Sequence, residues 1–242
     1  MLAFENVQIG YRHQILGVQN IRLVSGKCYA LIGANGSGKS TLLKTISGET
    51  PLLSGQILLN QQSISRMTVA EKSKELAFVD AHFRGIDFLT VYDYVALART
   101  PYTNFLGTLQ TKDHEIISTS IKKVGLWSKQ MTFTSELSDG ERQLISIARA
   151  IAQSPKVLLM DEPTAFLDYG NRLRLIEIVQ RLAKDQDICI VLSSHDLELC
   201  VQSKLELLLI DNTSHILEQQ APGFDLSSII ATSFKESERR PY

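Results

Sequence analysis

An eight-residue segment near the N-terminus has the residue types and the spacing of a phosphate-binding loop. Residues 33–40 read Gly-Ala-Asn-Gly-Ser-Gly-Lys-Ser, the pattern GxxxxGK[ST], between an apolar stretch and a run compatible with a helix. Glycines let backbone N–H groups approach phosphate oxygens, and Lys39 adds a fixed positive charge. Ser40 could place its hydroxyl on Mg²⁺, and the following helix would direct its unpaired N–H groups at the anion. The residues expected to bind a nucleoside triphosphate are Gly33, Ala34, Asn35, Gly36, Ser37, Gly38, Lys39, Ser40 and Thr41.

Two carboxylates and a histidine follow later apolar runs that are typical of buried strands. Asp161 and Glu162 come directly after residues 157–160, and His195 follows residues 188–193. Asp161 could hold Mg²⁺, directly or through water, and Glu162 could act as the general base toward the attacking water. A neutral His195 could hydrogen-bond the γ-phosphate and keep the water in line. Ligands of mainly parallel sheets lie at the carboxyl ends of the strands, so we expect these side chains to meet the phosphate loop.

A third segment precedes the amphipathic run 142–153. Ser138 and Glu141 have the spacing of a capping box, which favours a well-capped helix. Gly140 keeps the same helix start sterically open, which would let it receive an anion. The residues alone leave both interpretations open.

The elements that must position these residues alternate along most of the chain. The first sixty residues alternate like β structure, the stretch from about 85 to 153 shows no convincing strand, and strand-like and helix-like runs alternate after it. This order predicts an α/β fold with a mainly parallel sheet, helices on both faces and an inserted helical subdomain. The expected parts are a nucleotide-binding core at 1–84 and 154–220, a helical subdomain at 85–153 and a tail at 221–242.

Composition limits the partners and the compartment. The 242 residues are 44% hydrophobic, enough for one α/β domain with a sizeable core. Twenty-five basic against 26 acidic residues, with no basic cluster longer than Arg239-Arg240, argue against nucleic acid as the partner. Three distant cysteines indicate buried thiols of a reduced, cytosolic protein. No secretory signal is expected, and the apolar runs are too short to span a bilayer.

The motifs, in their order along the chain, resemble the nucleotide-binding subunit of an ABC transporter over about residues 2–220. The resemblance rests on the phosphate loop, on segments 137–141 and 158–163, on Phe166-Leu-Asp168, and on the Ser-His-Asp sequence at 194–196. It implies a P-loop NTPase core with an N-terminal antiparallel β portion. It also implies an ATPase that uses ATP and Mg²⁺.

The same resemblance implies that a second copy completes the site. Residues 137–141 correspond to the family's signature motif, normally Leu-Ser-Gly-Gly-Gln, which contacts the γ-phosphate of ATP held by the opposite subunit of a head-to-tail dimer. The matching residues are Leu137, Ser138, Asp139, Gly140 and Glu141. Asp139 and Glu141 depart from the family pattern, and the Asp139 carboxylate could weaken closure unless it points away from the phosphate.

Three further positions take expected roles from the family. Tyr11 matches the aromatic residue that stacks on adenine, although a strand tyrosine is the alternative. Asp168 matches the Asp-loop, which communicates across the dimer. Ala81 stands where the family has a glutamine, and an alanine cannot ligate Mg²⁺ or report γ-phosphate to a permease. Asp80 or His82 could substitute for it.

Several segments, among them 98–102 and 147–153, are similar to importers of iron complexes, haem and cobalamin. The leading hypothesis is an ATPase subunit of an iron-siderophore-type importer, at the cytoplasmic face of the inner membrane. Its partners would be a second copy, two transmembrane permease subunits and, indirectly, an extracytoplasmic substrate-binding protein. The alternatives are a soluble ABC-type ATPase without a permease and a regulatory nucleotide-binding module with weak hydrolysis.

Overall fold

The computed structural model describes residues 1–220, and within that range it contains one 11-stranded sheet. The strands follow the order β6-β5-β1-β2-β11-β10-β4-β9-β8-β7, and β3 pairs with β1 beside this order. Their bounds are β1 (Leu2–Gly10), β2 (Gln14–Val18), β3 (Ile21–Leu23), β4 (Cys28–Ile32), β5 (Ser54–Leu59), β6 (Gln62–Ser63), β7 (Leu76–Val79), β8 (Val157–Met160), β9 (Cys189–Ser194), β10 (Glu206–Asp211) and β11 (Ile216–Gln219). The predicted tail at 221–242 lies outside the described residues.

Strand directions divide the sheet into two parts. The neighbouring strands β10, β4, β9, β8 and β7 are all parallel, whereas β1 pairs antiparallel with β2, β3 and β5. Parallel neighbours require long crossover connections, and the helices of the chain occupy these connections. The predicted α/β fold, with a mainly parallel core and an N-terminal antiparallel portion, is therefore confirmed.

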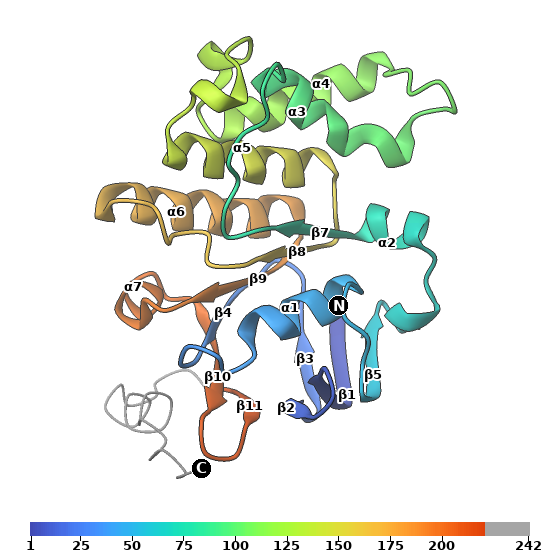
Figure 1. Cartoon of the computed structure of the whole chain (residues 1–242), viewed down its shortest axis with the longest axis vertical. Coiled ribbons are helices and arrows are strands. Elements are labelled where there is room, and N and C mark those ends of the chain that lie inside the picture. Colours follow the sequence, from blue (N-terminus) through green and yellow to red (C-terminus); the bar gives the residue numbers. More distant parts are fainter. Residues whose placement is uncertain (221–242) are drawn as a thin grey trace.

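Seven α-helices lie within residues 1–220 (Figure 1). They are α1 (Lys39–Ser47), α2 (Val69–Glu75), α3 (Val91–Ala96), α4 (Thr111–Lys123), α5 (Asp139–Ala152), α6 (Tyr169–Gln186) and α7 (Leu197–Gln202). Short 3-10 helices occur at Ile64–Arg66, Leu97–Tyr102, Trp127–Lys129 and Thr134–Glu136.

Two hydrophobic cores lie on opposite faces of the sheet because successive side chains of a strand point to opposite faces. In the fully buried strand β4, Ala30 and Ile32 belong to the core that includes residues of α5, α6 and α7, whereas Tyr29 and Leu31 belong to the core that includes α1. Strands β4 and β8 are apolar and buried at every position because both faces are covered. The phosphate loop therefore begins from a strand that packing holds on both sides.

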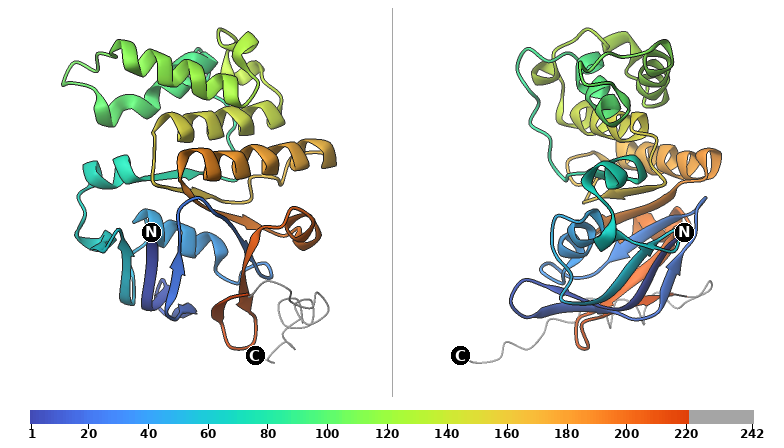
Figure 2. Two further views of the ribbon diagram at one scale, coloured as in Figure 1. Left: turned by 180° about the vertical axis from the view of Figure 1, so that it is seen from behind. Right: turned by 90° about the vertical axis from the view of Figure 1, so that its right-hand side faces the viewer.

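The segment expected to be a helical subdomain contains helices and loops. Helices α3, α4 and α5 contact one another, and α5 also contacts β7. Figures 1 and 2 show α3 and α4 at one end of the molecule, with α5 between them and the rest of the chain. In the described residues from 85 to 153, the β pairing is a single bridge between Thr90 and Phe133. The exact boundaries 85–153 stay a prediction.

The three cysteines are buried free thiols, as predicted. Burial raises the pKa of Cys189 to about 12 and that of Cys200 to about 11, and it raises the pKa of Cys28 further still. Among residues 1–220, no helix combines the length and the apolar character that crossing a bilayer requires.

Candidate functional site

The loop between β4 and α1 leaves the start of α1 open to an anion. Gly38 is the N-cap residue of α1, has φ 102° and gives the helix no side-chain cap. Gly36 has a φ of 78°, where a residue with a Cβ is strained. A Cβ at Gly33 would lie 2.7 Å from Ser37 Oγ, so the folding of the loop depends on this glycine as well. Phosphate oxygens could therefore accept hydrogen bonds from the first N–H groups of α1.

Lys39 lies under the loop with its ammonium group directed at loop carbonyls. The residue is 5% exposed, and its Nζ donates to Gly33 O at 2.8 Å and to Ala34 O at 3.0 Å. Burial lowers the pKa of Lys39 below its ordinary value, while attraction to Glu162 and Asp161 opposes the decrease. The positive charge is thus placed between the loop and the predicted carboxylates.

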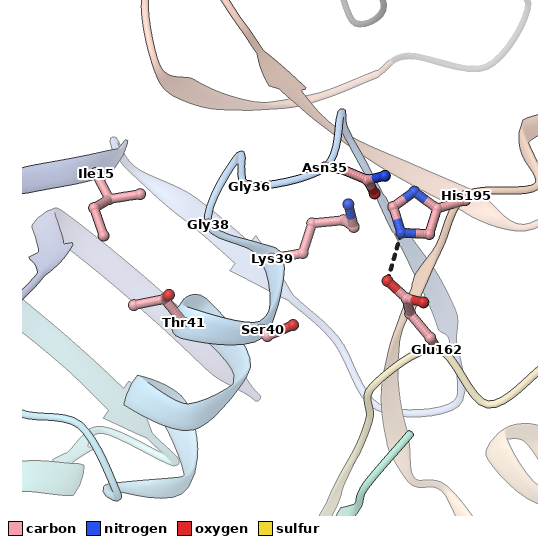
Figure 3. Close-up of a pocket in the computed structure, with 9 residues that line it drawn as sticks. All are labelled: Ile15, Asn35, Gly36, Gly38, Lys39, Ser40, Thr41, Glu162 and His195. Atoms are coloured by element: carbon pink, nitrogen blue, oxygen red, sulfur yellow. Dashed lines mark hydrogen bonds and ion pairs between the residues drawn. The ribbon is translucent and has the colours of Figure 1, made fainter. Parts of the chain in front are cut away.

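The carboxylates and the histidine lie where neighbouring parallel strands end. Asp161 and Glu162 follow β8, and His195 follows β9. His195 Nε2 lies 2.5 Å from Glu162 Oε1, and both side chains are partly exposed (Figure 3). Glu162 has a φ of 44°, in the left-handed region that is uncommon for residues with a side chain. The structure therefore brings Glu162 and His195 together in a strained, partly open position.

Ser193, which lies outside the predicted site residues, connects the Asp161 carboxylate to the backbone N–H of Glu162. Its Oγ donates to Asp161 Oδ1 at 2.7 Å and accepts the N–H of Glu162 at 2.8 Å. The side chain belongs to β9 and is completely buried. A serine that directly continues the apolar run of a buried strand was the available signal, because a buried hydroxyl needs a partner.

A cavity of about 160 Å³ joins the loop to the carboxylate and the histidine (Figure 3). The residues that line it are Ile15, Asn35, Gly36, Gly38, Lys39, Ser40, Thr41, Glu162 and His195. Ile15 of β2 was not predicted, although its half-buried aliphatic side chain lies beside the loop: a Cβ at Gly38 would lie 3.0 Å from Ile15 Cγ2. The cavity thus offers one apolar wall and an otherwise polar lining.

Other predicted nucleotide residues do not line this cavity. Gly33, Ala34 and Ser37 belong to the loop but not to the cavity lining, and Asp161 lies beside Glu162. Tyr11 follows β1 and is 67% exposed. Its ring is therefore available to an external group.

The signature segment forms the capped start of α5. Ser138 is the N-cap residue, and it exchanges capping-box hydrogen bonds with Glu141. Lys129 Nζ lies 2.6 Å from Glu141 Oε1, and this hydrogen bond holds the pKa of Glu141 below its usual range. Asp139 is paired with Arg142 at 3.2 Å. The expected capping box is present, and the segment does not line the cavity of its own copy.

Gly140 of the signature segment lies against Leu167, the residue before Asp168. Leu137 is buried, and a Cβ at Gly140 would lie 3.0 Å from Leu167 Cδ2, so the signature segment approaches the residue before Asp168. Asp168 caps α6, and its carboxylate accepts the backbone N–H of Asn171 at 2.9 Å. Its present contacts are therefore those of a helix cap.

Ala81 follows β7, and none of the residues proposed to replace the missing glutamine lines the cavity. The ring of His82 lies 5.0 Å from that of Phe166, measured between centroids. His82 is thus packed against the segment that leads to Asp168.

Oxygen atoms are the donors available to a Mg²⁺ ion beside the loop. Ser40 lines the cavity, and Asp161 is placed by Ser193 next to Glu162. Mg²⁺ prefers oxygen ligands and usually combines one or two carboxylates with substrate phosphates and water. Residues 1–220 contain no group of three or more His, Cys, Asp or Glu side chains that could hold a metal ion. This donor set fits an ion that is held partly by the nucleotide.

The comparison with known proteins identifies the family. The family described as "ABC transporter" matches residues 16–165. An uncharacterized ABC transporter ATP-binding protein of Methanocaldococcus jannaschii is 38% identical over 88% of this chain and 73% of its own length. The iron(3+)-hydroxamate import ATP-binding protein of Bacillus subtilis is 34% identical over 81% of this chain and 73% of its own length.

Solved structures agree with this assignment. A chain from a metal-chelate type ABC transporter in an inward-facing conformation superposes with a TM-score of 0.77 at 27% identity, covering 90% of this chain and 82% of that one. Its fold is thus shared over nearly all of the described residues. This chain belongs to the ABC transporter family, as an ATP-binding subunit that hydrolyses ATP.

Proposed function

We propose that the chain is the ATPase subunit of an ABC importer for an iron-siderophore-type complex. The ATPase site is carried by one observation, the convergence of Lys39, Glu162 and His195 on the cavity at the phosphate loop. The cargo class is supported by relatives named for iron(3+)-hydroxamate import, at 34% identity, and for achromobactin transport in Dickeya dadantii, at 32% identity.

In the proposed reaction, residues of one copy bind the triphosphate and prepare the water. Lys39 exchanges its carbonyl partners for phosphate oxygens, and the glycine-rich loop donates backbone N–H groups. Glu162 takes a proton from the water as the water oxygen bonds to the γ-phosphorus and the bond to the ADP oxygen breaks. His195 holds the Glu162 carboxylate in place. Ser40 and Asp161 would hold Mg²⁺, which neutralises phosphate charge when bound.

A second copy, arranged head to tail, is proposed to complete the site. The cavity of about 160 Å³ is smaller than the roughly 300–1,000 Å³ of most small-molecule pockets, so one copy leaves a nucleotide partly uncovered. The signature residues of the partner copy would cover the γ-phosphate, Tyr11 would stack on adenine, and Asp168 would act across the interface. The pairing of Asp139 with Arg142 supports this arrangement because it offsets the extra carboxylate.

The partners proposed outside the dimer are two transmembrane permease subunits and, through them, an extracytoplasmic substrate-binding protein. The chain would then lie at the cytoplasmic face of the inner membrane. Import functions in the names of the relatives support this location. Ala81 stands where the family has a glutamine, and this difference favours a second candidate function, that of a regulatory nucleotide-binding module with weak hydrolysis.

Co-purification with membrane subunits tests the proposal. The chain would be expressed with its own membrane partners, purified, and placed in liposomes with a labelled ferric siderophore and the matching binding protein. ATP should drive uptake, and cargo with binding protein should raise ATP turnover. A chain that co-purifies with no membrane subunit, or an ATP turnover that cargo leaves unchanged, contradicts the importer assignment.

A further inference from the structure

One buried hydroxyl, that of Ser193, links the side chain of Asp161 to the backbone of Glu162. Strand β8 pairs in parallel with β9, and its last registered pair is Met160 opposite Leu192. The next residues, Asp161 and Ser193, therefore lie side by side. Ser193 Oγ donates to Asp161 Oδ1 at 2.7 Å and accepts the Glu162 N–H at 2.8 Å.

The hydrogen bond to Glu162 is made at a strained position of the backbone. With φ at 44°, Glu162 adopts a left-handed conformation that is uncommon for a residue with a side chain and persists only where the surroundings hold it. Its N–H group points into the sheet edge, where Ser193 supplies the acceptor. The same residue presents its carboxylate to His195. The hydroxyl thus holds the backbone from which the base projects.

A purely structural role would not require a hydroxyl at this position. Ser193 is 0% exposed, and the residues before it in β9 are buried and mostly aliphatic. Burial of a hydroxyl costs free energy unless it is hydrogen-bonded. An apolar side chain at this position of the strand would avoid that cost. The hydroxyl hydrogen-bonds the Asp161 carboxylate and the backbone N–H of Glu162.

We propose that Ser193 is a positioning residue for ATP hydrolysis, which fixes Asp161 and Glu162 relative to each other. This inference rests on the proposed roles of the two carboxylates. By binding Oδ1, Ser193 orients the Asp161 carboxylate and leaves its other oxygen for Mg²⁺ or a bound water. By binding the Glu162 N–H, it sets the direction of the base toward the water and His195.

The test compares three single variants of the full chain in the presence of Mg-ATP. Ser193→Ala leaves the Glu162 N–H unpaired, and kcat should fall roughly tenfold to a hundredfold while KM for ATP changes little. Ser193→Cys keeps the shape but has only a weakly hydrogen-bonding thiol, and it should lose as much. Ser194→Ala is the matched control because it removes a neighbouring hydroxyl that is also buried and that accepts the Asp196 N–H at 3.0 Å. Its loss of kcat should be much smaller.

A second measurement avoids turnover altogether. Binding of a fluorescent ATP analogue in EDTA should be unchanged in Ser193→Ala, because the phosphate loop is intact. The Mg²⁺ concentration that half-maximally strengthens this binding should rise severalfold, because Asp161 is less well oriented. Thermal melting confirms that each variant is folded.

Several results would overturn the inference. Wild-type kcat in Ser193→Ala or Ser193→Cys would do so, as would equal losses in Ser193→Ala and Ser194→Ala, or an unchanged Mg²⁺ dependence. Glu162→Gln separates this failure from failure of the proposed mechanism. If Glu162→Gln is inactive while Ser193→Ala is normal, only the positioning role is wrong. If Glu162→Gln still hydrolyses ATP normally, the assignment of the base is wrong.

Discussion

Among single residues, Lys39 must exchange its hydrogen-bond partners when a nucleotide binds. Its ammonium group bonds two carbonyl oxygens of its own loop, and burial lowers its pKa. Phosphate oxygens would provide charged acceptors in their place, and charge-assisted hydrogen bonds are about twice as strong as neutral ones. The side chain is therefore held beside the phosphate position before the nucleotide arrives.

Lys39→Ala should weaken ATP binding by at least about tenfold, because two or more charge-assisted hydrogen bonds are lost. The affinity can be measured by fluorescence with an ATP analogue. Lys44→Ala is a suitable control, since Lys44 lies in the last turn of the same helix, away from the cavity. Equal affinities of wild type and Lys39→Ala would refute the assignment of the phosphate loop.

Glu162→Gln should retain ATP binding and lower turnover by at least about a hundredfold, because an amide cannot accept the proton from water. ATP should then accumulate between two copies and trap a closed dimer. Size-exclusion chromatography with ATP, against the same run with ADP, measures this. A variant that stays monomeric with ATP would contradict the proposed clamp.

The placement of Glu162 and His195 could be predicted from the sequence, whereas the contacts that Ser193 and Ile15 make could not. Two residues that follow parallel buried strands must reach the same sheet edge. A hydrogen bond from Ser193 to Asp161, however, depends on which residues of β8 and β9 are opposite each other. The contact between Ile15 and the loop depends on how the N-terminal strands lie against it. Local residue patterns predict neither the register of β8 and β9 nor the placement of the N-terminal strands.

At the scale of elements, a buried ion pair joins the helices beyond the sheet. Arg99 Nε lies 2.8 Å from Asp113 Oδ1, and Arg99 Nη1 donates to Ala152 O at the end of α5. Asp113 also accepts the N–H of Gln110 at 2.9 Å. That backbone hydrogen bond is the largest cause that holds the pKa of Asp113 below its usual range. The pair thus ties the 3-10 helix at Leu97–Tyr102, α4 and α5 together.

Asp113→Ala should lower the free energy of unfolding by about 3–5 kcal/mol at pH 7, because it leaves Arg99 buried without a counter-charge. Since the folded-state pKa of Asp113 is lowered, its contribution is present above the ordinary pKa and is lost as pH falls through the folded value. The difference between variant and wild type should therefore shrink in strong acid. Urea unfolding at several pH values measures it.

Asp185→Ala, at an exposed carboxylate of α6, is the control and should stay within about 0.5 kcal/mol of wild type. A loss in Asp113→Ala that is as small, or a difference that persists in strong acid, would show that the buried pair contributes little.

Element ends were less predictable than element types. Helix α3 ends at Ala96, and the chain continues as a 3-10 helix that contains Pro101, because proline lacks the N–H that an α-helix needs. The expected helix at 142–153 begins earlier, at Asp139, because Ser138 is its cap. The capping residues are evident in the sequence, and the first turn of the helix lies between the cap and the start of the amphipathic run.

At the scale of the whole molecule, the proposed head-to-tail dimer can be tested by mixing inactive chains. Lys39→Ala removes the phosphate contact, and Gly140→Asp places a carboxylate at the start of α5, against a phosphate of the partner's ATP. A mixed dimer would hold one intact site and one doubly defective site. With equal amounts, half of the dimers are mixed, so activity should recover to about a quarter of wild type.

The mixing experiment requires that both variants fold. The structure predicts that Gly140→Asp does fold. The new Cβ would lie 3.0 Å from the flexible end of Leu167, and an acidic residue suits the first turn of a helix. No recovery of activity upon mixing would contradict the head-to-tail arrangement.

The burial of the three native thiols makes the molecule suitable for site-selective labelling. A thiolate is the form that reacts with alkylating reagents, and pKa values of about 11 and 12 for Cys200 and Cys189 leave almost none of it at neutral pH. A cysteine introduced at the fully exposed Phe105 would be modified alone, without removal of the native ones. The rate at which Cys28, Cys189 or Cys200 is alkylated would then measure how often the sheet opens and exposes these thiols.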